Sequence, residues 1–174
     1  MDRNDSIIES ALTNAVSETM ENMAFEQVDM PQPDNPPQAT GEKYFWASLP
    51  IIKPLTGRIE IQLSIDYARI LAQSLFEGSD NKPTDDLVKD AVAEVLNTIA
   101  GRFMTQLVPP KEEFELGLPN VIIGKCPADQ INGIHRSFDV GGHLLTAFLF
   151  GITENASMGK GIKEEILNHE NLNS

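Results

Sequence analysis

The sequence predicts an α+β fold in which long helices cover one side of an antiparallel β-sheet. Residues 7–24 and 84–107 repeat hydrophobic positions with the period of an α-helix, whereas residues 57–65 alternate with the period of a β-strand. Short turn sequences between neighbouring strands are typical of antiparallel hairpins. Helices that pack on one face of such a sheet bury the hydrophobic side of both layers. We therefore expect a single domain over residues 1–174.

The first element is expected to be a helix over residues 7–24. Ser6 and Glu9 have the spacing of a capping box, which places the start of this helix at Ser6. Its hydrophobic positions recur at spacings of three and four and form one face: Ile8, Leu12, Ala15, Val16, Thr19 and Met23. The following segment, residues 31–40, is rich in proline. Because proline cannot donate to a β-ladder, we expect a loop insertion there.

Two strands are expected next, over residues 44–54 and 57–65, with residues 55–57 as the turn between them. In the second strand, isoleucine and leucine alternate with polar residues. This pattern predicts one buried face and one face in contact with water. Asp66 is expected to begin a short helix that ends at Gly78.

The longest helix is expected between Thr84 and Leu107. Thr84 is a suitable N-cap residue, and the two aspartates after it lie near the positive end of the helix dipole. Pro109 and Pro110 end the helix, because proline removes an amide donor and clashes with the preceding turn.

The remaining chain is expected to form about three strands and a polar tail. Residues 120–124 are a short apolar run, and residues 131–138 and 143–150 flank a hairpin turn at 139–142. The tail over residues 153–174 is polar. An apolar strand at the edge of a sheet is an aggregation hazard, so the run around Val121–Ile123 predicts pairing of two copies through sheet edges.

Composition narrows the range of partners. The net charge of −13 disfavours nucleic acid and anionic membranes, because both carry negative charge. The amino-terminal residues do not resemble a signal peptide, and no apolar run reaches the ~20 residues that span a bilayer. The single cysteine, Cys126, cannot form an internal disulfide, which fits the cytoplasm. His135 and His143 lack the companions of a metal site, and we expect no metal.

The polar side of the 84–107 helix is the candidate functional site. On a helical projection Asp90, Glu94, Asn97, Thr98 and Gly101 fall within a narrow stripe, and the opposite side is apolar. A carboxylate and a carboxamide one turn apart can act on the same small group. The spacing Glu-x-x-Asn is weakly specific, however, because solvent-facing sides of helices are rich in both residues. A plain solvated surface therefore remains an alternative at this point.

Two segments resemble the CheX/CheC family of chemotaxis phosphatases: residues 90–101 and residues 118–124. The family carries an acidic or serine residue, then Glu, then Asn on one helix, with a proline further along the chain. The matching residues are Asp90, Glu94, Asn97 and Pro119, and Pro119 falls one residue earlier than the family pattern places it. The first helix carries no Glu-x-x-Asn, so the chain is similar to the single-site CheX branch, whose members are typically homodimers.

The resemblance implies a CheC-like α/β sandwich that hydrolyses the aspartyl phosphate of a CheY-like response regulator in chemotaxis or related two-component signalling. It implies that Asn97 orients the attacking water and that Glu94 pairs with a lysine of the partner. Asp90, Thr98 and Gly101 would contact the partner. The chain would need no cofactor of its own, because Mg²⁺ is expected on the phosphorylated regulator. The alternative is a non-catalytic CheX-fold module that binds a regulator or dimerises as a scaffold.

Overall fold

The computed structural model describes residues 3–30, 43–76, 82–124 and 133–154. The predicted proline-rich insertion, Cys126 and nearly all of the predicted tail lie outside these residues. The elements follow in the order α1 (Arg3–Thr19), the π-helix η1 (Met20–Ala24), β1 (Val28–Asp29), β2 (Tyr44–Lys53), β3 (Leu55–Ser64), α2 (Ile65–Leu75), α3 (Asp85–Leu107), β4 (Glu115–Leu116), β5 (Asn120–Gly124), β6 (Ile134–Val140) and β7 (His143–Glu154).

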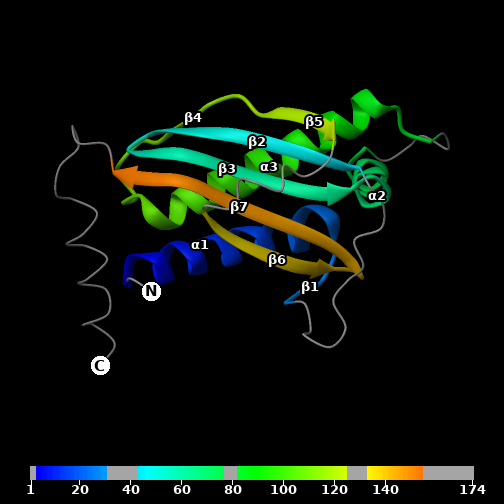
Figure 1. Ribbon diagram of the computed structural model, residues 1–174. Helices are drawn as coiled ribbons and strands as arrows, with labels where there is room; N and C mark the ends of the chain where they lie inside the picture. The colour runs from blue at the N-terminus through cyan, green and yellow to red at the C-terminus, as the bar shows by residue number, and fades with distance from the viewer. Residues whose placement is uncertain (1–2, 31–42, 77–81, 125–132, 155–174) are drawn as a thin grey trace.

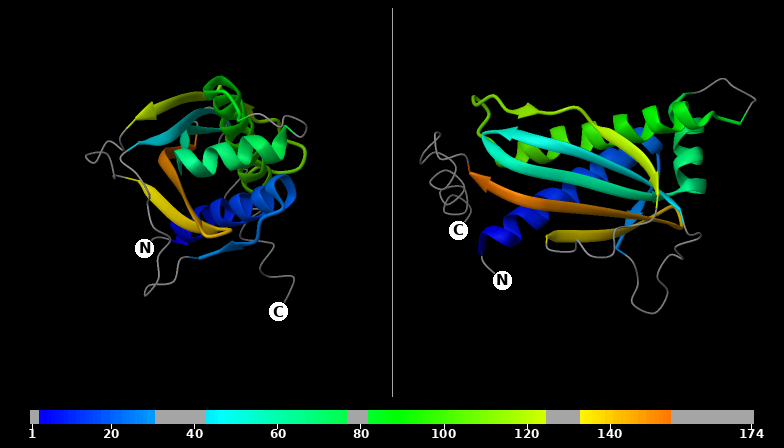
Figure 2. Two further views of the ribbon diagram at one scale, coloured as in Figure 1. Left: turned by 90° about the vertical axis from the view of Figure 1, so that its right-hand side faces the viewer. Right: turned by 45° about the horizontal axis from the view of Figure 1, so that its top comes forward.

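The strands form one antiparallel sheet in the order β1-β6-β7-β3-β2-β4, and β5 also pairs with β2. Helices α1 and α3 lie side by side behind this sheet (Figure 1). The second view shows the same two layers, with α2 at the end of the sheet where β3 finishes (Figure 2). The predicted α+β class and its one-sided helical layer are therefore confirmed.

The inner face of the sheet supplies half of the core. Every second pair across β2 and β3 is apolar, for example Phe45 opposite Leu63 and Ala47 opposite Ile61. All four of these side chains are buried against the helical layer. The face of α1 predicted to be apolar is buried or half-buried throughout. Burial of these side chains stabilises the two layers against each other, at roughly 25 cal/mol per Å² of apolar surface.

The outer face of the sheet is less exposed to solvent than the alternating pattern predicts. Glu60 points to this side yet is only 5% exposed, and its carboxylate lies 2.5 Å from the Arg58 guanidinium. The neighbouring strands carry aromatic rings on this face. The tilted rings of Trp46 and Phe148 have centroids 5.0 Å apart, and Arg58 lies over the Phe150 ring. The predicted two-residue alternation along β3 is confirmed. An ion pair and aromatic packing, rather than water, surround the Glu60 side chain.

Several predicted boundaries were wrong. Helix α1 begins at Arg3, so Ser6 lies within the helix and is not its N-cap. Residues 55–57 belong to β3, and the reversal falls at Pro54, where the missing amide donor ends the β2 ladder. Helix α2 begins one residue earlier than expected, because the Ser64 hydroxyl rather than Asp66 accepts the first free amide, from Tyr67.

The β6–β7 hairpin is confirmed with a shorter turn. Gly141 and Gly142 have φ angles of 57° and 84°, a left-handed conformation that glycine adopts without steric cost. The Asp139 carboxylate accepts the Gly142 amide at 2.8 Å. Strand β6 is described from Ile134, and residues 131–132 of the predicted strand lie outside the described part. Two strands of two residues each, β1 and β4, were not predicted, because so short a stretch carries no periodicity.

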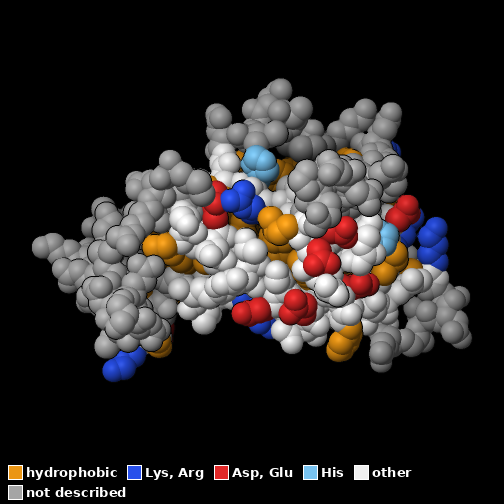
Figure 3. All heavy atoms as spheres, turned by 90° about the horizontal axis from the view of Figure 1, so that it is seen from below, with side chains coloured by type: hydrophobic (Ala, Val, Ile, Leu, Met, Phe, Trp, Pro, Cys, Tyr) orange, Lys and Arg blue, Asp and Glu red, His pale blue; other side chains and the backbone are white. Residues whose placement is uncertain are grey.

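Two surface properties bear on partners. None of the helices in the described part of the chain is long and apolar enough to cross a membrane. Carboxylates lie dispersed among hydrophobic side chains on the face seen from below β6 and β1 (Figure 3).

Candidate functional site

Helix α3 is a rigid support for the candidate site. The Thr84 hydroxyl caps it by accepting the Leu87 amide at 3.3 Å, as predicted, and Asp85 and Asp86 occupy its first turn. Its apolar side is buried along the whole length: Val88, Ala91, Val92, Val95, Leu96, Ile99, Ala100, Phe103, Met104 and Leu107. A helix anchored on one complete side holds the opposite side in a fixed position.

The predicted stripe lies on the open side of α3. Asp90, Glu94 and Asn97 are exposed, whereas Thr98 and Gly101 are half-buried. The helix therefore brings all five predicted residues onto one accessible surface. This placement follows from the helical period alone and does not establish what the residues bind.

Glu94 and Asn97 present free polar groups to solvent. Neither side chain has a hydrogen-bond or ion-pair partner within the described residues. A carboxylate accepts hydrogen bonds only, whereas a carboxamide has both an acceptor and two donors. Together they can bind a cation on one side and orient a water molecule on the other.

The amino-terminal half of the stripe is negative. Asp86, Asp90 and Glu94 follow at spacings of four residues, and all three are exposed. Like charges at this spacing destabilise a helix by about 0.2–0.5 kcal/mol per pair. Lys89 pairs with Asp86 at 3.8 Å. Within the described residues, Asp90 and Glu94 have no ion-pair partner. A cationic partner would relieve this repulsion.

The carboxyl-terminal half of the stripe is bare. A methyl group built on Gly101 would meet no atom of the described residues within 4 Å outside its own stretch of helix, and the residue has an ordinary helical backbone. Glycine within a helix costs about 0.5–1 kcal/mol relative to alanine. Nothing within the described chain therefore requires glycine at this position.

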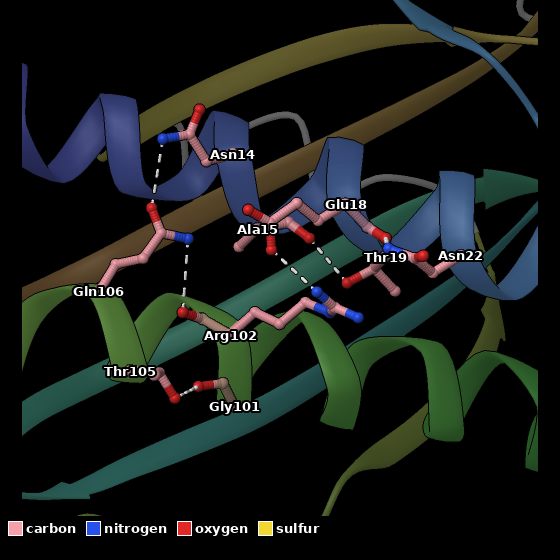
Figure 4. Close-up of polar contacts among 9 residues, drawn as sticks. All are labelled: Asn14, Ala15, Glu18, Thr19, Asn22, Gly101, Arg102, Thr105 and Gln106. Carbon is pink, nitrogen blue, oxygen red and sulfur yellow. Dashed lines mark hydrogen bonds and ion pairs between the residues drawn. The ribbon is translucent and has the colours of Figure 1, made fainter. Parts of the chain in front are cut away.

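Polar contacts between α1 and α3 border this bare surface (Figure 4). Arg102 pairs with Glu18 at 2.8 Å, and the Asn14 amide donates to Gln106 at 3.3 Å. The Thr105 hydroxyl donates to the Gly101 carbonyl at 2.8 Å. Sequence reasoning did not find the two contacts between α1 and α3, because the pairing of two helices distant in the sequence is a tertiary property.

The other predicted features lie outside this constellation. Pro119 is half-buried directly before β5, a strand that contacts α3. His143 stacks on Tyr67 at 4.7 Å and His135 on Phe148 at 6.0 Å, so both rings have packing partners. Burial, with a smaller contribution from Glu26, raises the pKa of the Tyr67 hydroxyl. No group of three potential metal ligands gathers among the described residues.

Comparison with known families identifies a match. Residues 47–132 match the family described as chemotaxis phosphatase CheX, and this range contains the whole α3 stripe and Pro119. A comparison with curated protein sequences finds no match.

Solved structures share the fold. A chemotaxis protein CheX from Desulfovibrio desulfuricans has 21% sequence identity and a TM-score of 0.66, over 84% of this chain and 99% of that one. CheX in a CheX–CheY–BeF3–Mg²⁺ complex from Borrelia burgdorferi has 21% identity and a TM-score of 0.59, over 83% and 97%. A CheC-like superfamily protein from a Shewanella species has 16% identity and a TM-score of 0.58, over 87% and 100%.

Proposed function

Because the chain belongs to the CheX/CheC family of chemotaxis phosphatases, through the match over residues 47–132, we propose that it hydrolyses the aspartyl phosphate of a CheY-like response regulator. The observation that carries the proposal is the exposed pair Glu94 and Asn97, which have no partner among the described residues and lie one turn apart on a helix whose other side is buried. The CheX–CheY complex from Borrelia supports the choice of partner.

Asn97 has the chemistry to position the nucleophile. In the proposed reaction the oxygen of a water molecule bonds to phosphorus, and the bond from phosphorus to the aspartate oxygen breaks. The products are inorganic phosphate and the free carboxylate. Phosphoryl transfer depends mainly on positioning and charge stabilisation. A carboxamide can orient the water through a hydrogen bond without itself ionising.

Glu94 has the chemistry to hold the partner. Its carboxylate would pair with a lysine beside the phosphorylated aspartate, in a charge-assisted hydrogen bond. The partner would also supply Mg²⁺ for the charge on the phosphoryl oxygens, so this chain needs no cofactor of its own. We further propose that Asp90, Thr98 and Gly101 contact the partner surface around this centre and that the reaction takes place in the cytoplasm.

A phosphate-release assay tests the proposal. Regulators from the same genome are phosphorylated with a small-molecule phosphodonor in Mg²⁺, and their dephosphorylation is followed with and without the protein. We expect accelerated release for at least one regulator and loss of the acceleration with Asn97→Ala. A protein that binds a phosphorylated regulator without accelerating release is instead the non-catalytic module.

We also propose that the protein is a homodimer through the β5 edge. Strand β5 pairs with β2 on one side and with no other strand of the described chain. It carries apolar side chains on both faces, and Ile122 and Ile123 are 52% and 37% exposed. Strands buried on both faces read as continuous apolar runs, so a second copy across this edge would match the pattern.

A further inference from the structure

The side chains that neighbour Gly101 on α3 bond elsewhere within the protein. Arg102 and Gln106, the long side chains next to it, are held toward α1 by Glu18 and Asn14 (Figure 4). The Thr105 side chain bonds back to the Gly101 carbonyl. Gly101 itself has open space where a Cβ would stand. This leaves a bare patch on α3 at Gly101, one turn beyond Asn97, which carries no side chain of its own.

This patch lies within reach of the proposed reaction centre. Residues four apart on a helix have Cβ positions about 5–6 Å apart. In the proposed reaction a water molecule lies about 3 Å from the Asn97 amide and about 3 Å from the phosphorus atom. The phosphoryl group is then two such contact distances from the amide. A partner segment that surrounds the phosphoryl group would therefore lie within reach of Gly101. On the other side of Asn97 it would meet the side chain of Glu94.

We propose that Gly101 is a specificity-determining residue at which the main chain of the partner's phosphorylated loop packs directly against α3. The inference rests on the proposed function and adds the mode of contact. The bare patch admits a partner backbone without a bulky side chain between the two surfaces. The side chain of glycine is a single hydrogen atom, which leaves room for the partner backbone.

The substitutions Gly101→Ala and Gly101→Leu test this contact, with Gln73→Ala and Gln73→Leu as matched controls at an exposed position of α2. Three quantities are measured: Tm, phosphate release, and the Kd for a CheY-like regulator carrying beryllofluoride and Mg²⁺. Gly101→Ala should raise Tm by roughly 1–4 °C, because alanine favours the helix, yet weaken binding several-fold. Gly101→Leu should weaken binding roughly tenfold or more through overpacking. Both Gln73 variants should bind like the wild type.

The outcomes separate this inference from the proposed function. Wild-type affinity in Gly101→Leu, together with an inactive Asn97→Ala variant, overturns the contact and leaves the phosphatase. Weakened binding in Gly101→Leu, with a wild-type protein that releases no phosphate, overturns the phosphatase and leaves the contact. A changed oligomeric mass in Gly101→Leu with unchanged regulator binding assigns the patch to a second copy. A protein that binds no regulator overturns both.

Discussion

At the scale of single residues, the candidate site consists of two side chains with different chemistry. Glu94 is a charged acceptor and Asn97 a neutral donor and acceptor. Both are exposed on α3 without partners in the described chain. Because free side chains carry no internal packing role, substitutions here should alter function while leaving the fold intact.

Asn97→Ala should lower kcat by roughly 10²–10³, the scale observed when one preorganised polar group is lost from a reaction centre. If the amide acts on the attacking water, its contribution appears in the transition state, and KM for the regulator should change little. Steady-state phosphate release gives both constants, and a thermal melt confirms folding. A folded variant with wild-type kcat would remove Asn97 from the mechanism.

Glu94→Ala should raise KM as well as slow turnover. Loss of one member of a charge pair across an interface costs on the order of 2–5 kcal/mol, partly because the other charge is left unpaired. The raised KM distinguishes this variant from Asn97→Ala. Glu94→Gln keeps the size of the side chain and removes its charge. Comparison of the two variants therefore separates the effect of the charge from that of the size. Normal affinity in both variants would contradict the proposed lysine contact.

At the scale of elements, α1 is a structural support for α3. Arg136 of β6 pairs with Glu9, and Arg102 of α3 pairs with Glu18, so that polar contacts join α1 to the sheet and to its neighbouring helix. The apolar face of α1 is buried between them, including Leu12, Ala15 and Val16. The helix carries no Glu-x-x-Asn pair, which fits a supporting role.

The variants Glu18→Ala and Glu21→Ala should keep phosphate release within a few-fold of the wild type. Glu18 is about half exposed in its pair with Arg102, and such pairs contribute about 0–1 kcal/mol. Tm should therefore fall by at most a few degrees. The measurement is kcat beside that of Asn97→Ala. A comparable loss in either glutamate variant would mean that α1 takes part in the chemistry.

At the scale of the whole molecule, the sheet has one face covered by helices and one edge with exposed apolar residues. The strongly acidic net charge keeps copies apart by repulsion, so an interface between copies needs apolar contact. The β5 edge offers such contact through Ile122 and Ile123.

Ile122→Lys should convert a dimer to a monomer, because a charge at the edge of a sheet opposes strand pairing. Light scattering at micromolar concentration measures the mass. Ile70→Lys on α2 is the control, since Ile70 is also partly exposed but belongs to a helix and not to the β5 edge. A wild-type protein of monomer mass would rule out the dimer, as would an Ile122→Lys protein of dimer mass.

The sequence by itself determined the features that depend on local periodicity. The 3.6-residue repeat of α3 placed Asp90, Glu94 and Asn97 on one exposed stripe, and Thr84 marked the helix start. The same repeat gave the buried side of α1, and the two-residue repeat gave the inner face of β3. Each of these signals lies within a few consecutive turns or residues.

Only the tertiary structure decided the features that join distant segments. The contact of Arg102 with Glu18, the burial of Glu60 beside Arg58 and the pairing of β1 with β6 depend on which elements become neighbours. Two-residue strands have no pattern of their own and form because a partner strand offers hydrogen bonds. The contacts of Arg102 and Gln106 with α1, beside Gly101, likewise depend on the pairing of the two helices, which no local pattern in α3 encodes.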